Sequence, residues 1–258
     1  MLGGHTMNVQ GQVAIVTGAA SGLGRATAAA LAAEGAVVAL LDRDATAGAA
    51  AAAATGGRFF PLDVADAEAA ERVLPEIAAL GPVRVLVNCA GVAPAARLVG
   101  RDGPMALDGF ERVVRVNLVG TVNMMRLAAA VMTRLEPQAD GERGVIVNTA
   151  SVAAFEGQIG QIAYAASKGG VAALTLPAAR ELASQGIRVM AIAPGLFGTP
   201  MLRGMPERVQ ESLAATVPFP SRFGEPEEYA ALVLHILANR MLNGSVIRLD
   251  GALRMAAR

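Results

Sequence analysis

Seven short apolar runs recur along the chain, and segments with a helical pattern of apolar and polar residues lie between them. Most of the runs are continuously hydrophobic, which is typical of strands that are buried on both faces of a parallel sheet. The predicted strands are Val13–Thr17, Val37–Leu41, Arg58–Leu62, Val83–Asn88, Val145–Thr149, Arg188–Ala193 and Ser245–Leu249. The predicted helices are Gly24–Glu34, Ala45–Ala54, Ala67–Ala79, Asp108–Leu135, Ala163–Gln185 and Pro226–Leu237.

The regular alternation of strands and helices predicts the fold class. Strand, helix and strand repeated this often indicate right-handed crossovers, and therefore an α/β fold with a doubly wound parallel sheet. Because the pattern leaves no room for a linker, we predict a single Rossmann-type domain with seven strands over residues 1–258. Residues 1–8 precede the first strand, and we expect them to be mobile.

Three segments interrupt the pattern. Val92–Gly109 is rich in glycine and proline and Glu136–Gly144 is polar, and long loops in a compact domain are often functional. Gly195–Phe223 contains Pro200, Pro206, Pro218 and Pro220 and follows a strand end, where a lid over a ligand crevice would lie. We therefore expect residues 195–223 to form a substrate lid.

Composition narrows the class of protein. The hydrophobic fraction of 53% excludes a disordered chain, and the aromatic fraction of 3% predicts a core of Ala, Val, Leu and Ile. Lys and Arg number 22, and Asp and Glu also number 22, so the basic excess of a nucleic-acid-binding protein is missing. No apolar run reaches the ~20 residues of a membrane span, and we expect neither a membrane nor a nucleic acid as partner.

The single cysteine, Cys89, excludes an intrachain disulfide and fits a reducing compartment. Residues 1–8 have neither the basic nor the apolar region of a signal peptide. Together these observations predict a cytoplasmic location. The two histidines, His5 and His235, lie near the terminus and in a predicted helix, and neither suggests a metal site.

A glycine-rich turn, Thr17–Gly24, follows the first predicted strand and opens the first helix. Its glycines would let backbone N–H groups approach a pyrophosphate, to which the helix N-terminus adds partial positive charge. Asp42 ends the second strand, where a carboxylate accepts hydrogen bonds from adenosine ribose hydroxyls and repels a 2′-phosphate. This arrangement predicts NAD rather than NADP, although Arg43 is a residue type that can accommodate a 2′-phosphate.

Two further strand ends carry candidate cofactor contacts. Asp63 and Val64 end the third strand, where Asp63 could hydrogen-bond an adenine or cap the next helix, for which Asp66 is the better candidate. The small residues of Asn88–Gly91 end the fourth strand and would let a cofactor lie against the backbone. Because no partner histidine is evident, we interpret Cys89 as a small buried apolar residue rather than a nucleophile.

Tyr164 and Lys168 lie four residues apart in a predicted helix, which places a phenol and an ammonium on one helix face. Because a nearby ammonium favours the phenolate, Lys168 is expected to lower the pKa of Tyr164 toward the range of a general base. Ser151 ends the fifth strand, where its hydroxyl could hold a substrate oxygen. Asn117 lies inside a predicted helix, where its side chain could interrupt the hydrogen-bond ladder and hold a water that links Lys168 to solvent.

The chain resembles the short-chain dehydrogenase/reductase family over essentially its whole length. The resemblance rests on Thr17–Gly24, Asn88–Gly91, Asn117, Ser151, Tyr164, Lys168 and Pro194–Gly195, which occur in the family's order and spacing. It implies that the catalytic residues are Asn117, Ser151, Tyr164 and Lys168. It implies that the cofactor contacts are Gly18, Ser21, Gly22, Leu23, Gly24, Asp42, Asp63, Val64, Asn88, Cys89, Ala90, Gly91, Tyr164, Lys168, Pro194, Phe197 and Thr199. At Cys89 many members have a second asparagine, but a backbone contact there does not depend on the side chain.

Four stretches, residues 144–160, 191–200, 217–222 and 246–255, are similar to NAD-dependent members of the family that oxidise 3-hydroxyacyl-CoA and hydroxysteroids. This similarity implies conversion of an (S)-3-hydroxyacyl-CoA to a 3-oxoacyl-CoA by a homotetramer. It also implies that Phe197 and Thr199 contact the nicotinamide end of NAD. The implied substrate contacts are Ser151, Gln158, Gln161 and Tyr164, and no metal is implied.

Two alternatives stay open. The first is another activity of the same family, either a 3-oxoacyl-carrier-protein reductase, against whose use of NADPH Asp42 argues, or a hydroxysteroid or polyol dehydrogenase. The second is a cofactor-bound scaffold without turnover, against which the complete set of Ser151, Tyr164 and Lys168 argues. We expect the two loops Val92–Gly109 and Gly195–Phe223 to shape the substrate pocket and so to determine which of these substrates fits.

Overall fold

The computed structural model describes residues 7–101 and 103–257 and confirms the predicted parallel sheet. Seven strands pair in the order β3-β2-β1-β4-β7-β8-β9, and every pairing is parallel. The strands are β1 (Val13–Thr17), β2 (Val37–Asp42), β3 (Arg58–Pro61), β4 (Val83–Asn88), β7 (Gly144–Thr149), β8 (Ile187–Pro194) and β9 (Val246–Leu249). Each predicted strand is therefore present, and its ends differ from the prediction by one residue at most.

The order of the strands places a crevice at one end of the sheet. The chain runs outward from β1 through β2 to β3, then returns to β4 on the other side of β1 and continues outward to β9. In an open sheet of this kind, ligands bind at the carboxyl ends of the strands, where the winding direction reverses. The winding therefore points to the carboxyl ends of β1 and β4.

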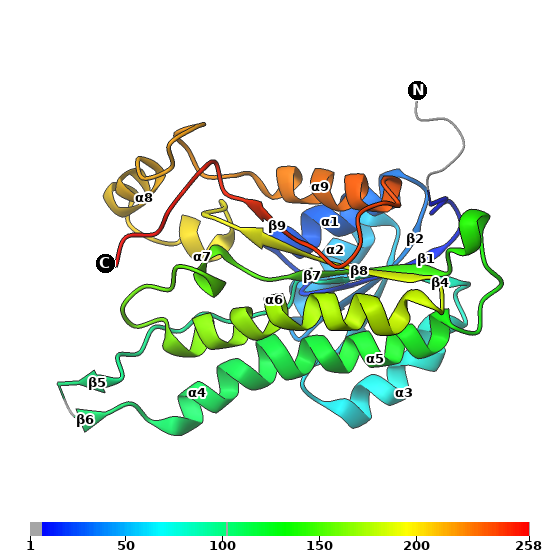
Figure 1. Cartoon of the computed structure of the whole chain (residues 1–258), viewed down its shortest axis with the longest axis horizontal. Helices are drawn as coiled ribbons and strands as arrows, with labels where there is room; N and C mark the ends of the chain where they lie inside the picture. The colour runs from blue at the N-terminus through cyan, green and yellow to red at the C-terminus, as the bar shows by residue number, and fades with distance from the viewer. Residues whose placement is uncertain (1–6, 102, 258) are drawn as a thin grey trace.

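Helices cover both faces of the sheet (Figure 1). One layer consists of α1 (Gly22–Ala33), α2 (Ala45–Thr55) and α9 (Pro226–Ala238). The other layer consists of α3 (Ala67–Ala78), α4 (Leu107–Val114), α5 (Gly120–Met132) and α6 (Ile162–Ala183). In Figure 1 the carboxyl ends of the strands face the side that carries α7 (Pro200–Arg203), α8 (Glu207–Ala214) and the C-terminus.

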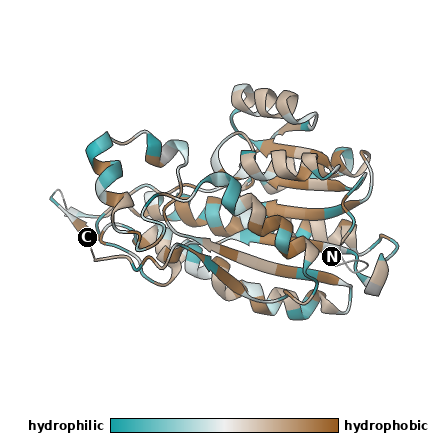
Figure 2. Cartoon of the chain, turned by 90° about the horizontal axis from the view of Figure 1, so that it is seen from above, coloured by the Kyte–Doolittle hydropathy of each residue, from teal (hydrophilic) through white to brown (hydrophobic). Residues whose placement is uncertain are grey.

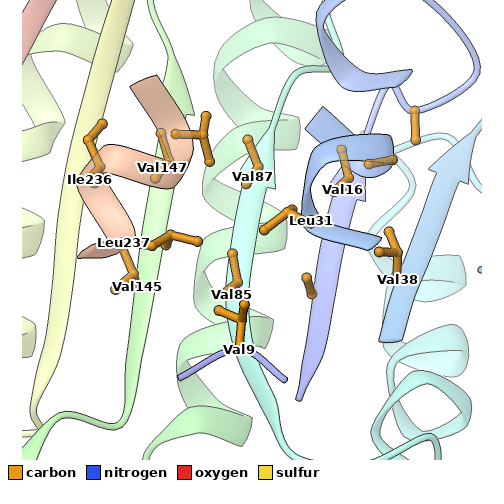
Figure 3. Close-up of a cluster of buried hydrophobic side chains, with 14 of the residues drawn as sticks. Val9, Val16, Leu31, Val38, Val85, Val87, Val145, Val147, Ile236 and Leu237 are labelled. Atoms are coloured by element: carbon orange, nitrogen blue, oxygen red, sulfur yellow. The ribbon is translucent and has the colours of Figure 1, made fainter. Parts of the chain in front are cut away.

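The core lies between the sheet and these two helix layers, and valine and alanine dominate it. Figure 3 shows side chains of α1 and α9, among them Leu31 and Ile236, packed over valines of the central strands. All five residues of β1 and all six of β4 and of β7 are buried, as their continuously apolar sequences predict. Figure 2 shows the same distribution, with hydrophobic strands inside and hydrophilic residues on the surrounding helices and loops.

The predicted helix Asp108–Leu135 is divided in the structure. A π-helical turn, η1 (Arg115–Val119), lies between α4 and α5 and contains Asn117. Such turns are rare and occur often at functional sites. The interruption that the sequence suggested at Asn117 is therefore present as a change of helix type.

The three predicted loops contain short elements. Val92–Gly109 includes a small hairpin of β5 (Val99–Gly100) and β6 (Gly103–Pro104), which projects beside α4 in Figure 1. Gly195–Phe223 includes α7 and α8, and a single turn, η2 (Ala139–Gly141), lies in Glu136–Gly144. Another single turn, η3 (Val152–Ala154), follows β7.

The expectation of a mobile segment 1–8 falls outside the described residues for 1–6. For residues 7 and 8 it stays a prediction, and the side chain of Met7 is buried in the same core cluster as Val9. Among the described residues, no helix combines the length and the apolar character needed to cross a membrane.

Candidate active site

A cavity of about 480 Å³ lies at the carboxyl ends of the strands. It is lined by the turn after β1, the segments that follow the other central strands, the first turns of α6 and one residue of the C-terminal segment, Met255. The predicted site residues that line it are Gly18, Ser21, Gly22, Leu23, Gly24, Asp42, Asp63, Val64, Cys89, Ala90, Gly91, Ser151, Gln161, Tyr164, Lys168, Pro194, Phe197 and Thr199. Residues as far apart in the sequence as Gly18 and Thr199 thus meet in one cavity, as the fold predicts for strand ends.

The turn between β1 and α1 is shaped to receive a phosphate. Gly18 has a φ of 64°, and a Cβ atom at this position would lie 2.7 Å from the backbone nitrogen of Ala90. Ser21 precedes α1 but makes no side-chain capping bond, and the first turn contains no acidic residue. The first N–H groups of α1 therefore face the cavity without a carboxylate beside them, which suits an anionic group.

The carboxylate of Asp42 is fixed at the end of β2. Its Oδ2 atom accepts a hydrogen bond from the backbone N–H of Ala20 at 3.0 Å, and its Oδ1 atom accepts one from Asp44 at 3.0 Å. The Arg43 guanidinium is exposed and lies 3.9 Å from the Asp63 carboxylate. A negative group is thus held rigidly at the cavity wall, whereas the neighbouring positive group is on a solvated side chain.

The structure distinguishes the roles of Asp66 and Asp63, which the sequence left open between a helix cap and a ligand contact. Asp66 caps α3, since its carboxylate accepts a hydrogen bond from the backbone N–H of Ala69 at 3.0 Å. Asp63 accepts one from the backbone N–H of Ala65 at 3.0 Å and lines the cavity. The cap is therefore Asp66, and Asp63 is available to a ligand.

Ser151 and Tyr164 both line the cavity, and the Ser151 hydroxyl lies close enough to the Tyr164 phenol to influence its pKa. Ser151 follows β7, and its hydroxyl accepts a hydrogen bond from the backbone N–H of Ala153 at 3.1 Å. Burial raises the pKa of Tyr164, and the nearby Ser151 hydroxyl opposes this effect. The expected lowering of the Tyr164 pKa by Lys168 is not seen, because burial dominates and Lys168 Nζ lies 5.8 Å from the ring centroid.

Lys168, the one lysine in the sequence, is 4% exposed. Its Nζ atom donates a 2.6 Å hydrogen bond to the backbone carbonyl of Thr149. Burial lowers its pKa from 10.5 to about 8. A Cβ atom at Gly91 would lie 3.2 Å from Asn117 Oδ1 and 3.6 Å from Nζ, so the backbone after β4 lies directly beside both side chains.

Asn117 does not line the cavity but joins two of the segments that do. Its Oδ1 atom accepts a hydrogen bond from the backbone N–H of Val92 at 2.8 Å, and its Nδ2 atom donates to the Val92 carbonyl at 2.9 Å. Nδ2 also donates to Ser167 Oγ at 3.0 Å. Through these bonds Asn117 fixes the loop after β4 against the helix that carries Tyr164 and Lys168.

Two other predicted contacts also lie outside the lining. Asn88 is buried and its Nδ2 atom donates to Asn148 Oδ1 at 2.9 Å, so its side chain joins β4 to β7. Gln158 donates to the backbone carbonyl of Ala256 at 3.0 Å, so its side chain faces the C-terminal segment. Neither side chain is directed at the cavity, because each is held by a partner that is distant in sequence.

Met255 is a lining residue that sequence reasoning did not single out. Its backbone N–H donates to Glu156 Oε2 at 3.0 Å, and the same carboxylate is held by Arg248. These bonds hold the C-terminal segment against the segment that contains Glu156, between β7 and α6. No local pattern marks Met255, since its position depends on an ion pair between residues 92 positions apart.

Comparisons with known proteins agree with this geometry. The profile of the short chain dehydrogenases matches residues 12–210. The 3-hydroxyacyl-CoA dehydrogenase type-2 of Bos taurus is 53% identical over 255 residues, which cover 96% of this chain and 97% of that protein. The protein of the same name from Homo sapiens is 53% identical over 253 residues, with the same coverage of both chains. A crystal structure of 3-hydroxyacyl-CoA dehydrogenase type-2 from Mycobacterium avium has a TM-score of 0.94 at 42% identity, covering 98% of this chain and 99% of that one.

Proposed function

Because this chain belongs to the short-chain dehydrogenase family, we propose that it is an NAD-dependent oxidoreductase that converts (S)-3-hydroxyacyl-CoA into 3-oxoacyl-CoA. The observation that carries the proposal is the placement of Ser151 beside Tyr164, with Lys168 one helical turn away, in the same cavity as the α1 N-terminus. One half of the cavity suits a dinucleotide and the other half suits an alcohol that loses a proton and a hydride.

The residues around the β1–α1 turn fit a nicotinamide dinucleotide. Gly18 and Gly22 both have positive φ angles, and a side chain at Gly18 would collide with the backbone at Ala90. The N–H groups at the start of α1 would hold the pyrophosphate, and Asp42 would accept hydrogen bonds from the adenosine ribose. The fixed carboxylate of Asp42 supports NAD over NADP, since it would repel a 2′-phosphate.

Three side chains would take part in the transfer of the proton from the substrate hydroxyl. A nicotinamide ring bound in this cavity would supply the hydride acceptor and a positive charge. Tyr164, as the phenolate, takes the hydroxyl proton, while the Ser151 hydroxyl donates a hydrogen bond to the substrate oxygen. Because burial alone raises the pKa of Tyr164, the reaction needs positive charge near the phenol, and Lys168 carries the nearest ammonium.

The printed names of the relatives support the substrate class. The proteins at 53% identity carry 3-hydroxyacyl-CoA in their names, which favours this substrate over the carrier-protein, steroid and polyol alternatives. Met255 and Gln161 line the cavity, and Met255 is hydrogen-bonded to Glu156 in the segment between Ser151 and Tyr164, so both would contact the acyl group. The lid prediction for residues 195–223 is part of this proposal, since Phe197, Thr199 and Leu202 line the same cavity.

The substitution Tyr164→Phe tests the reaction. Removing the phenol hydroxyl should lower kcat for 3-hydroxybutyryl-CoA oxidation by about 10²–10⁴-fold, the usual contribution of a general base. NADH binding, followed by the fluorescence of the dinucleotide, should change little and serves as the control for folding. Activity within tenfold of the unmodified chain would refute the assigned role of Tyr164.

Cofactor preference is tested separately by comparing turnover with NAD⁺ and NADP⁺ at one substrate concentration. We expect NAD⁺ to be preferred, and Asp42→Ser should reduce that preference by about tenfold or more, because the charge repulsion is lost. Equal turnover with both dinucleotides by the unmodified chain would contradict the role given to Asp42.

A homotetramer is also proposed. It is supported by apolar side chains exposed on the outer faces of the helices, Val119 and Val122 around the start of α5 and Leu176 on α6. The mass in solution, measured by light scattering, should be about four times 26.2 kDa. A cytoplasmic location is a further proposal, which the single cysteine supports.

A further inference from the structure

Tyr229 is a fully buried tyrosine on the opposite side of the sheet from Tyr164. It belongs to α9, is 0% exposed, and is one of two tyrosines in the chain. A buried phenol needs a hydrogen-bond partner, because its hydroxyl has been removed from water. Its Oη atom lies 2.7 Å from Thr149 Oγ1, so the partner belongs to the strand that leads directly to Ser151.

The neighbouring bonds determine which hydroxyl donates. Thr149 Oγ1 lies 2.6 Å from the backbone carbonyl of Asn88, and a carbonyl can only accept. The single hydroxyl proton of Thr149 is therefore used there, and Tyr229 must donate to Thr149. The result is a directed chain from Tyr229 through Thr149 to Asn88, which fixes α9, β7 and β4 relative to one another.

Thr149 is also the residue to which Lys168 is attached. The backbone carbonyl of Thr149 accepts the 2.6 Å hydrogen bond from Lys168 Nζ, while its side chain is held by Tyr229 and Asn88. Any movement of Thr149 therefore moves the acceptor that orients the ammonium. Among the described residues, the titratable groups that face Lys168 are Tyr164 on its own helix and Cys89 after β4.

The thiol of Cys89 lies beside both of these hydroxyls. Its Sγ atom lies 3.9 Å from Tyr229 Oη and 3.7 Å from Thr149 Oγ1, and its residue lines the cavity. Burial raises the pKa of both Cys89 and Tyr229, so both side chains stay neutral. A neutral layer of hydroxyls and a thiol thus lies directly beneath the proposed dinucleotide site.

We propose that Tyr229 is a positioning residue that acts through Thr149 to fix the carbonyl that orients Lys168. This inference rests on the proposed function only in that Lys168 is taken to serve the dinucleotide and Tyr164. It assigns a role to a helix that contributes no residue to the cavity lining. Substitution of Tyr229 should therefore affect the cofactor and the ionisation of Lys168 rather than the acyl group.

The test uses Tyr229→Phe in the full chain, because phenylalanine keeps the ring and removes only the hydroxyl. Loss of one net hydrogen bond should weaken NADH binding about fivefold. The alkaline limb of kcat/KM for NAD⁺ should move about half a pH unit lower, because a loosened acceptor favours the ammonium less. The KM for the acyl-CoA should stay within twofold. Since the chain contains no tryptophan, NADH fluorescence can be followed without protein background near it.

Two further substitutions keep the test decisive if Tyr229→Phe folds poorly. Thr149→Val removes the central hydroxyl and should shift the same limb in the same direction, whereas Thr149→Ser keeps the hydroxyl and should restore the profile. The matched control is Thr175→Val on α6, since this buried hydroxyl donates to the Val171 carbonyl of its own helix.

The outcomes separate this inference from the proposed function. If the unmodified chain neither binds NADH nor oxidises 3-hydroxyacyl-CoA, the proposed function fails. If it does both, and Tyr229→Phe and Thr149→Val lower the thermal midpoint without moving the pH profile, Tyr229 is merely structural and the inference is overturned. A shifted profile in both variants, with Thr175→Val unchanged, supports it.

Discussion

The two ends of the sheet hold their buried cations in different ways. At the amino end, Arg188 is the second residue of β8, and its Nε atom donates to Glu142 Oε1 at 2.6 Å. The same guanidinium donates to four carbonyls at the C-terminal end of α9, those of Ile236, Leu237, Asn239 and Leu242. At the carboxyl end, Lys168 is as deeply buried, but within residues 7–101 and 103–257 its ammonium bonds to one carbonyl, that of Thr149.

This difference separates stability from reactivity. A guanidinium with a carboxylate and several carbonyls is fully satisfied, and its removal would leave unpaired groups behind. A buried ammonium with one acceptor is under-compensated, which is why burial lowers the pKa of Lys168 to about 8. The amino end thus stabilises the fold, while the carboxyl end retains a group whose remaining hydrogen-bonding capacity is available to a ligand.

The largest expected effect is at the amino end, with Arg188→Met. Removing the guanidinium leaves the Glu142 carboxylate with only part of its compensation and uncaps α9, and the free energy of unfolding should fall by about 3–5 kcal/mol. This change in the free energy of unfolding is measured by urea denaturation. Arg72→Met is the control, because the Arg72–Glu68 pair is exposed and should contribute less than about 1 kcal/mol. A loss below 1 kcal/mol for Arg188→Met would remove the distinction between the two ends.

Lys168→Met should have the opposite sign at the carboxyl end. The fall in pKa from 10.5 to about 8 corresponds to about 3 kcal/mol against the buried ammonium, so an apolar side chain should raise stability by up to that amount at pH 7. Activity should fall by about 10²-fold or more, since the charge near Tyr164 is lost. A variant that is both inactive and less stable would show that Lys168 is compensated as fully as Arg188.

The difference in stability between the unmodified chain and Lys168→Met should depend on pH, and the lowered pKa of Lys168 gives the sign of this dependence. Below pH 8, Lys168 is protonated in both the folded and the unfolded chain, and its full cost is present. Between pH 8 and about 10.5 the unfolded chain binds more protons than the folded one, so stability rises with pH. Thermal unfolding of the unmodified chain and of Lys168→Met should therefore converge as the pH approaches 10.5, and a constant difference would contradict the lowered pKa.

The two ends also differ in how far the sequence predicts them. The carboxyl end follows from local patterns, because a glycine turn, polar residues after apolar strands and the Tyr164–Lys168 spacing all refer to positions close in sequence. All seven strands and the Asp66 cap were predictable in the same way.

Contacts between distant segments were not predictable. The side chain of Gln158 is held by the backbone of Ala256, and Met255 reaches the cavity through the Glu156–Arg248 pair. The shift of the Tyr164 pKa also depends on burial. The sequence predicted that Lys168 would lower this pKa, whereas in the structure burial raises it. Each of these outcomes is decided by packing between elements rather than by residue type.

The smallest expected effect tests whether neutral hydroxyls hold the carboxyl end together. Thr17 Oγ1 accepts hydrogen bonds from the backbone N–H groups of Cys89 at 3.1 Å and Ala90 at 3.2 Å. Thr17→Val leaves both donors without this acceptor, and stability should fall by about 1–3 kcal/mol. Because Cys89 and Ala90 line the cavity, NADH affinity should fall with it, whereas Arg188→Met should leave NADH affinity unchanged while the chain stays folded. Equal effects of the two substitutions on NADH affinity would show that the ends are coupled, and the comparison between a stabilising end and a reactive end would then fail.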